Sequence, residues 1–301
     1  MLALIQSRSS LAGIGFMCLG IAMFSFNDAM GKWLLAAYSV GQLLLIRSLA
    51  ALVVLAPAVL RSGVAAIAFP PRPGLQALRV TMSTVEVAFF YWAVSAMPLA
   101  ETVTFWLATP IYVAVLAGPL LGEVTPLRRW LAIGIGFSGV VVALNPGGAL
   151  FGWPALVAFV GSLCFALMMI VTRQLRGTPD LTLVIWQTTA ALGLGLVLAP
   201  FGWVTPGLMD TALLSLLGIV SMVAHIATNR ALKLAPASTV VPYQYTLIVW
   251  AVLLGWLVFG DVPARTTLIG AAVIVGAGIW IFLDEKRERQ EDLAATEELR
   301  D

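Results

Sequence analysis

The chain is divided into ten apolar segments, each about long enough to cross a lipid bilayer. A transmembrane helix needs about 20 mostly apolar residues, and short polar or Pro/Gly-rich joins separate the segments. They cover residues 11–35, 43–60, 75–97, 99–121, 130–145, 153–174, 181–199, 211–232, 237–259 and 266–283. Within a bilayer a helix satisfies its own backbone hydrogen bonds. We therefore predict an all-α integral membrane protein with ten transmembrane helices.

The composition supports this prediction and excludes several other classes of protein. Hydrophobic residues make up 60% of the chain and charged residues 11%, against about 25% charged residues in soluble domains. The lipid bilayer is therefore the expected surroundings. The net charge is only +2, and the basic residues do not gather on one face, so we expect no nucleic-acid partner. With one histidine and two cysteines, Cys18 and Cys164, inside apolar segments, we expect no metal and no cofactor.

Most of the 17 Lys and Arg residues lie at alternate segment ends. Cytoplasmic loops of membrane proteins are enriched in these residues. The ends that carry Arg61, Arg72, Arg128 and Arg230 are therefore predicted to face the cytoplasm. Both termini then lie inside, including the charged tail 284–301, and we expect a multi-pass protein of the inner (cytoplasmic) membrane.

The second half of the sequence repeats the first. MPLAETVTF (97–105) aligns with APASTVVPY (235–243) at an offset of 138 residues, which also aligns GEV (122–124) with GDV (260–262). Each half has five segments, an odd number, so the second half must enter the membrane upside down. The join after the second segment carries Arg61 and Arg72, whereas the join after the seventh carries no Lys or Arg. We predict two inverted five-helix repeats, residues 1–146 and 147–283.

Several motifs resemble those of a known family. FNDAMGK, LLLIRSLAAL and FFYWAVSAMPLAETVTFWLATPIYVAVLAGPLLGE follow one another in the first half, and NRALKLAPASTVVPYQYTLIVWAVLLGWLVFGD lies in the second. The set resembles the EamA repeat of the drug/metabolite transporter superfamily, from about residue 13 to 283. The resemblance implies a ten-helix exporter with a central cavity lined by helices 1–4 and 6–9, and with helices 5 and 10 at the periphery. Because Ile248 stands where the first copy has Pro110, we expect the two halves to differ at that bend.

Repeats and resemblance together favour a secondary transporter. Inverted repeats are typical of transporters with a midplane substrate site between the halves. The family includes amino-acid exporters, so we expect export of small organic metabolites, particularly aromatic or hydrophobic amino acids, by alternating access. The peripheral helices 5 and 10 would permit a homodimer.

Two other functions remain as alternatives. A channel-like facilitator would need a ring of like charges or a filter loop, and an intramembrane enzyme would need a nucleophile–base pair or paired carboxylates. The sequence pattern reveals neither the features of a channel nor those of an enzyme. We therefore expect no catalytic residue.

Charged residues inside the apolar segments are the first candidates for a binding site. A charge at the bilayer centre costs at least about 2.5–3.5 kcal/mol. Asp28 and Lys32 are one helical turn apart and can pair in a water-filled cavity, although Lys32 can also extend to the membrane surface. Glu86 either pairs with Arg79 or Arg47, or, like Asp28, carries a coupling proton or binds a substrate ammonium. Arg47 itself either anchors the interface or binds a substrate carboxylate.

Polar and aromatic residues on shared helical faces complete the set. His225 shares a face with Ser221 and Asn229, which indicates cavity lining or an interhelical hydrogen bond. Asn27 points away from the face of Asp28 and is expected to contact another helix. The aromatic candidates suit a solute with an apolar body, or simply pack in the core. The cavity-lining candidates are Asp28, Lys32, Arg47, Glu86, Trp106, Thr109, Trp186, Gln187, His225, Asn229, Tyr243 and Thr246.

Overall fold

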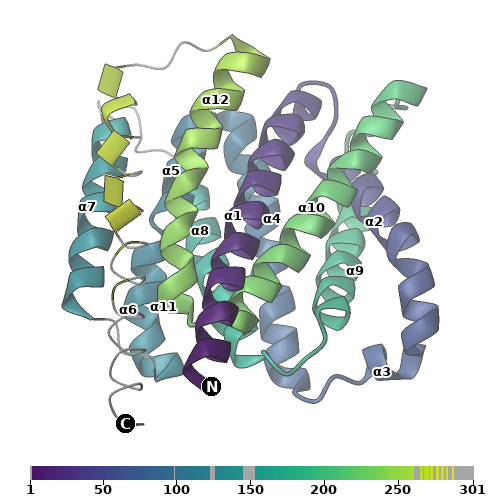
Figure 1. Cartoon of the computed structure of the whole chain (residues 1–301). Helices are drawn as coiled ribbons and strands as arrows, with labels where there is room; N and C mark the ends of the chain where they lie inside the picture. The colour runs from purple at the N-terminus through teal and green to yellow at the C-terminus, as the bar shows by residue number, and fades with distance from the viewer. Residues whose placement is uncertain are drawn as a thin grey trace.

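The computed structural model of the chain is a bundle of helices (Figure 1). It describes residues 2–97, 99–122, 126–144 and 153–260, together with 265–266, 268–270, 272–273, 276–277, 279–280, 283 and 287. Every regular element in these ranges is helical, as predicted. The predicted repeat boundary at 146/147 and nearly all of the predicted tail 284–301 lie outside the described residues, and both stay predictions.

Seven of the predicted segments correspond to one long helix each. They are α1 (Leu2–Leu35), α2 (Val40–Ser62), α4 (Pro73–Ala96), α7 (Leu127–Leu144), α8 (Trp153–Gln174), α9 (Asp180–Leu198) and α10 (Leu208–Leu234). A short helix that we did not predict, α3 (Val64–Ala68), joins α2 to α4. The side chain of Ser39 caps α2 by accepting a hydrogen bond from the backbone N–H of Gln42 at 3.3 Å. Pro73 begins α4, where its missing N–H needs no partner.

The fourth and ninth segments are each broken. The fourth comprises α5 (Leu99–Leu107) and α6 (Thr109–Leu121), and the ninth comprises α11 (Ala237–Val240), the 3-10 helix η1 (Val241–Thr246) and α12 (Leu247–Phe259). The starts of α6 and α12 match at the repeat offset, and both helices end at a glycine of positive φ, Gly122 (67°) and Gly260 (69°). The break is therefore repeated although Ile248 replaces Pro110. The expected difference between the halves lies instead in the 3-10 turns around Pro242.

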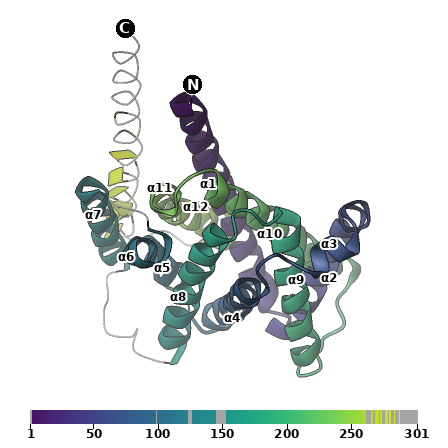
Figure 2. The same cartoon turned by 90° about the horizontal axis from the view of Figure 1, so that it is seen from below.

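The two halves pack against each other in a pseudo-two-fold pattern. Helix α1 packs against α10, and its repeat equivalent α8 packs against α4, the equivalent of α10. Helices α2 and α9, which are equivalent in the two repeats, pack together. Helix α5 of the first repeat packs against α12 of the second. Figure 2 shows α7 at one edge of the bundle and α2, α3 and α9 at the other, with α1, α4, α8 and α10 between them. Helix α7, the fifth predicted segment, is therefore peripheral, as the resemblance implied.

Helices α2 and α9 lie antiparallel and very close together. Gly41, near the start of α2, faces Leu198, the last residue of α9, and a Cβ added to Gly41 would lie 2.5 Å from Leu198. Gly195 in the last turn of α9 approaches the backbone of Leu45 equally closely. The start of α2 thus lies beside the end of its equivalent helix. Equivalent ends of the repeats are at opposite faces of the bundle, so the second repeat is inverted, as predicted.

Within the described residues, six helices are long and apolar enough to cross a membrane. They include α2, α8, α9, α10 and most of α1, and the broken ninth segment from Val241 to Phe259. Helix α4 is not among them, although it has 24 residues. Its buried side chains include Gln76, Arg79 and Ser83, which lower its hydropathy and lie inside the protein. These polar side chains are therefore shielded from lipid by neighbouring helices.

Candidate functional site

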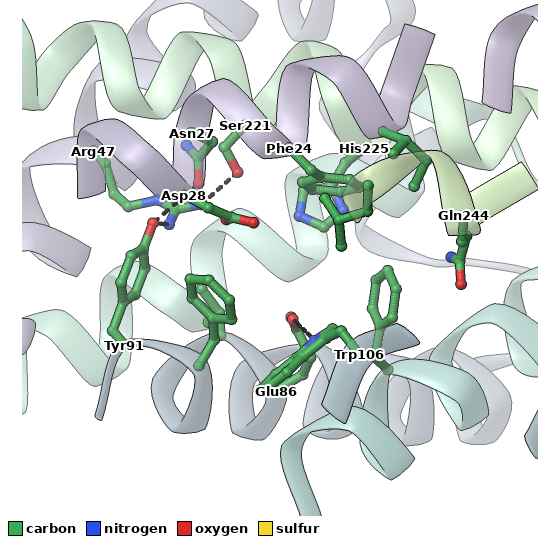
Figure 3. A pocket seen from close by; sticks show the side chains of 15 residues that line it. Phe24, Asn27, Asp28, Arg47, Glu86, Tyr91, Trp106, Ser221, His225 and Gln244 are labelled. Atoms are coloured by element: carbon green, nitrogen blue, oxygen red, sulfur yellow. Dashed lines mark hydrogen bonds between the residues drawn. The ribbon is translucent and has the colours of Figure 1, made fainter. Parts of the chain in front are cut away.

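A central cavity lies between the two repeats (Figure 3). The space between its lining side chains is about 610 Å³, including the part that is open to solvent. The first repeat contributes side chains from α1, α2, α4 and α5, and the second from α8, α10, η1 and α12. The lining residues are Ile21, Phe24, Asn27, Asp28, Arg47, Glu86, Val87, Phe90, Tyr91, Trp106, Phe165, Ser221, His225, Gln244 and Leu247.

A hydrogen-bonded chain around Arg47 forms one wall of this cavity. One guanidinium nitrogen of Arg47 donates to the hydroxyl of Tyr91 at 2.5 Å, and the other donates to the hydroxyl of Ser221. The Tyr91 hydroxyl donates in turn to Oδ1 of Asn27 at 3.0 Å, and Nδ2 of Asn27 donates to the carbonyl of Leu217 at 2.8 Å. The chain joins α1, α2, α4 and α10. Arg47 therefore lies inside the bundle and is only 7% exposed.

Two half-buried carboxylates, Asp28 and Glu86, line the same cavity from α1 and α4. Oε1 of Glu86 accepts a hydrogen bond from Nε1 of Trp106 at 3.1 Å. Among the described residues, neither carboxylate has a Lys or Arg nitrogen within 4.0 Å. Of the two alternatives for Glu86, a direct ion pair with Arg79 or Arg47 is therefore not the one that the structure shows. Each carboxylate instead faces the cavity, as Figure 3 shows.

The predicted Asp28–Lys32 pair is also wrong. Nζ of Lys32 lies 5.3 Å from the centre of the Phe259 ring in α12, and Lys32 does not line the cavity. A spacing of four residues puts two Cβ atoms on one helical face, but the long Lys32 side chain extends away to an aromatic ring on a neighbouring helix. A cation above an aromatic face is stabilised by the ring quadrupole.

Aromatic rings line much of the rest of the cavity. The rings of Phe24 and Phe165 meet edge to face at 6.2 Å between centroids, and those of Phe90 and Trp106 meet at 5.0 Å. The His225 ring packs edge to face on Phe24 at 4.9 Å. Trp106 and His225 were predicted to line the cavity, and the structure places both there.

Arg79 organises a second polar cluster and is fully buried. Its Nε donates to the Thr172 hydroxyl at 2.7 Å, Nη1 to the Leu183 carbonyl at 3.1 Å and Nη2 to Oδ1 of Asn229 at 2.9 Å. These bonds join α4, α8, α9 and α10. The candidate Asn229 thus belongs to this cluster and not to the cavity lining.

Polar contacts tie helix ends together at both ends of the bundle. At the end beyond Arg79, Nζ of Lys233 lies 2.5 Å from Oδ1 of Asp180. At the other end, Tyr38 donates to Asp210 at 2.5 Å, and the fully buried Gln42 exchanges two hydrogen bonds with the backbone of Val204. Donation to Asp210 raises the pKa of Tyr38, which lies between two membrane spans.

The other predicted site residues lie around the cavity and not in its lining. Gln187 belongs to a smaller polar cavity behind Arg47, between α2, α4, α9 and α10. Trp186 donates to the carbonyl of Ile67 at 2.9 Å. Thr109 and Tyr243 are buried without lining the cavity, and Thr246 donates to the carbonyl of Tyr243 at 2.8 Å.

Sequence reasoning missed several lining residues for which a signal existed. Phe24 lies four residues before Asp28, and Phe90 four residues after Glu86, so each aromatic ring shares a helical face with a carboxylate. Tyr91 and Phe165 carried no comparable local signal. Asn27 contacts α10, as predicted, and also lines the cavity.

Within the described residues, no three His, Cys, Asp or Glu side chains gather where they could hold a metal ion. The absence of a cofactor stays a prediction. The cavity presents charged, amide, hydroxyl and aromatic side chains to one space. This arrangement suits noncovalent binding of an organic solute.

Comparison with known proteins agrees with this geometry. A riboflavin transporter of Rhizobium johnstonii is 30% identical over 217 residues, 70% of this chain and 71% of that protein. An S-adenosylmethionine uptake transporter of Rickettsia prowazekii is 25% identical over 281 residues, 93% of this chain and 95% of that protein. A riboflavin transporter of Vibrio cholerae is 28% identical over 72% of this chain and 74% of that protein.

The fold and the repeats have counterparts as well. A solved crystal structure superposes with a TM-score of 0.72 at 19% sequence identity, covering 93% of this chain and 98% of that one. The model of the EamA-like transporter family matches residues 11–145 and again residues 152–283. Two copies of the repeat thus cover most of the sequence. The chain is a multi-pass membrane protein that belongs to the EamA-like transporter family of the drug/metabolite transporter superfamily.

Proposed function

We propose that the protein is a secondary transporter that carries a small organic metabolite through the central cavity by alternating access. The observation that carries this proposal is a cavity with Asp28, Arg47 and Glu86 in its wall, formed by both repeats of an inverted pair. Charged side chains inside a membrane bundle are costly and mark solute pathways. Rocking of one repeat against the other would open the cavity to each side in turn.

The contacts at the two ends of the bundle support this mechanism. Exposure of the cavity at one end requires the Arg79 cluster and the Asp180–Lys233 pair to separate, and exposure at the other requires the Tyr38 and Gln42 contacts to separate. We propose that both termini face the cytoplasm of a cell whose inner membrane holds the protein.

We propose that the transport direction is uptake and that the solute is a metabolite with a ring. The relatives named above are described as transporters of riboflavin and as uptake transporters of S-adenosylmethionine, and both solutes join a heteroaromatic ring to a polar chain. These names favour uptake over the export expected from the resemblance, and they do not favour amino acids. Trp106, Phe90 and Phe165 would contact the ring.

Counterflow in proteoliposomes tests the proposal. Vesicles preloaded with unlabelled riboflavin, S-adenosylmethionine or an aromatic amino acid are given the same labelled solute outside. We expect transient, saturable accumulation of at least one ring-bearing solute. Flux that rises linearly with concentration, without counterflow, would indicate a channel-like facilitator. Chemical conversion of the solute would indicate an enzyme.

Substitution of two tryptophans, one in the cavity and one outside it, tests whether the solute passes through this cavity. Trp106→Phe keeps a ring but loses the hydrogen bond to Glu86, so we expect uptake to fall by roughly tenfold, the effect of one hydrogen bond to a charged group. Trp256, on α12, is 56% exposed and outside the lining. Trp256→Phe is the matched control and should transport normally; equal loss in both variants would argue against this cavity.

A further inference from the structure

The formal charges of the cavity do not balance. Its lining contains two carboxylates, Asp28 and Glu86, and one guanidinium, Arg47. A buried ion is tolerated in a low-dielectric bundle when an opposite charge or several hydrogen bonds compensate it. Within the described part of the chain, no Lys or Arg nitrogen lies within 4.0 Å of either carboxylate.

Arg47 is held by neutral groups. The two hydrogen bonds seen for its guanidinium go to the hydroxyls of Tyr91 and Ser221. These bonds orient the side chain without cancelling its charge. A guanidinium has five N–H groups, so donors remain with which Arg47 can bind an anionic or hydroxyl group of a solute.

Aromatic rings stand beside both carboxylates. Phe24 shares a helical face with Asp28, Phe90 shares one with Glu86, and the Trp106 indole donates to Glu86 directly. All of these side chains line the same cavity, and Figure 3 shows Asp28, Glu86 and Trp106 around it. Carboxylates next to aromatic faces form a favourable surrounding for an organic cation, which gains both ion pairing and cation–π attraction.

We propose that the cavity selects an organic solute with a positive charge, which Asp28 and Glu86 hold beside the aromatic rings, while Arg47 binds an anionic or hydroxyl group of the same solute. The inference deepens the proposed function and rests on this cavity being the transport site. A zwitterion with one extra cationic centre would balance two carboxylates and one guanidinium. An uncharged ring compound would leave both carboxylates unpaired.

A pair of probes that differ in charge tests the inference by binding alone. S-Adenosylmethionine carries a sulfonium, an ammonium and a carboxylate, and its thioether analogue lacks one methyl group and the sulfonium charge. Equilibrium binding to the purified full-length protein in detergent micelles should favour the sulfonium compound at least about tenfold. Tryptamine and its uncharged N-acetyl form make a second pair on an unrelated scaffold.

Two isosteric variants assign the effect to the carboxylates. Asp28→Asn and Glu86→Gln should each reduce the ratio of cationic-member to neutral-member affinity by several fold. Asp210 lies outside the cavity and bonds to Tyr38. Asp210→Asn therefore controls for the loss of a carboxylate elsewhere in the bundle, and it should retain the ratio of the two affinities whatever its effect on each of them. Thermal unfolding of each variant checks that it is folded.

Several results would overturn the inference. They are equal or weaker binding of the cationic member in both pairs, binding of neither member of either pair, and an unchanged preference in both Asp28→Asn and Glu86→Gln. Failure of the proposed function differs from all of these. Charge-selective binding without counterflow would refute the carrier and leave this inference standing, whereas counterflow without charge selectivity would refute this inference alone.

Discussion

The hydroxyl of Tyr91 is the point at which the polar wall of the cavity is assembled. It accepts a hydrogen bond from Arg47 and donates one to Asn27, and the Tyr91 side chain is only 1% exposed. The guanidinium carbon of Arg47 also lies 5.3 Å from the centre of the Tyr91 ring. One side chain therefore sets the positions of two others that come from different helices.

Replacement of Tyr91 by phenylalanine should loosen this wall. Tyr91→Phe leaves buried donor and acceptor groups on Arg47 and Asn27 without that partner, which costs about 1–3 kcal/mol. We expect a lower thermal unfolding midpoint and solute binding weakened by roughly tenfold, measured on purified protein in detergent. Tyr245 is equally buried and donates only to the Ile133 carbonyl at 3.2 Å, away from the cavity. Tyr245→Phe should lose some stability but no affinity, and a similar loss of affinity in both variants would contradict this role for Tyr91.

The close packing of α2 against α10 depends on a glycine. A Cβ added to Gly218 of α10 would lie 1.8 Å from the backbone carbonyl oxygen of Arg47. Real Cβ contacts do not reach this distance, and a carbonyl in the middle of a helix cannot move aside by itself. Gly218 thus lets α10 approach the turn of α2 that presents Arg47 to the cavity, and it brings Ser221 within hydrogen-bonding distance.

Gly218→Ala should therefore separate α2 from α10 and break the bond between Arg47 and Ser221. We expect a large drop in folded yield and in the thermal unfolding midpoint, measured by size-exclusion chromatography and thermal unfolding. Gly15 in α1 is the matched control, because an added Cβ there would have no heavy atom within 4 Å. Gly15→Ala should be neutral or stabilising by up to about 1 kcal/mol. Normal stability of Gly218→Ala would show that the two helices can shift apart at little cost.

At the scale of the whole molecule, the inverted repeat makes a prediction about sidedness. Ser62 ends α2, and Phe201 follows the end of the equivalent helix α9, and both side chains are exposed. Because α2 and α9 are antiparallel neighbours, these two positions lie at opposite faces of the bundle. From the Lys and Arg residues of the loops, we predict that Ser62 faces the cytoplasm.

Cysteine labelling measures this directly. In a background with Cys18 and Cys164 replaced by serine, a membrane-impermeant maleimide applied to intact cells should label Phe201→Cys and not Ser62→Cys. Permeabilised cells should show labelling of both. Labelling of both variants in intact cells, or of Ser62→Cys alone, would overturn the proposed orientation. Uptake by the cysteine-free background confirms that the labelled protein is functional.

Much of the architecture could be predicted from the sequence because its causes are local or periodic. Segment length and hydropathy identified helices such as α8, whose bounds match the predicted ones, since a bilayer demands about 20 apolar residues. The break in the ninth segment was not expected, because Ile248 stands where the first copy has Pro110, yet it aligns with the break in the fourth segment at the repeat offset.

The site could be predicted only in part, because side-chain partners come from distant parts of the chain. Arg47 meets Tyr91 and Ser221, which are 44 and 174 residues away along the sequence. Spacing on one helix predicted a pair of Asp28 with Lys32, but packing gave Lys32 an aromatic neighbour on α12 instead.

The sequence by itself determined the helical class, the inverted repeat and the presence of costly charges inside the membrane, because hydropathy and charge act residue by residue. Only the tertiary structure decided which partners those charged side chains have and which of them face the cavity. It placed Arg79 in a buried cluster outside the cavity and left Asp28 and Glu86 facing the open space. The physical reason is that electrostatic and hydrogen-bond partners are chosen by distance in space, which helix packing sets and sequence separation does not.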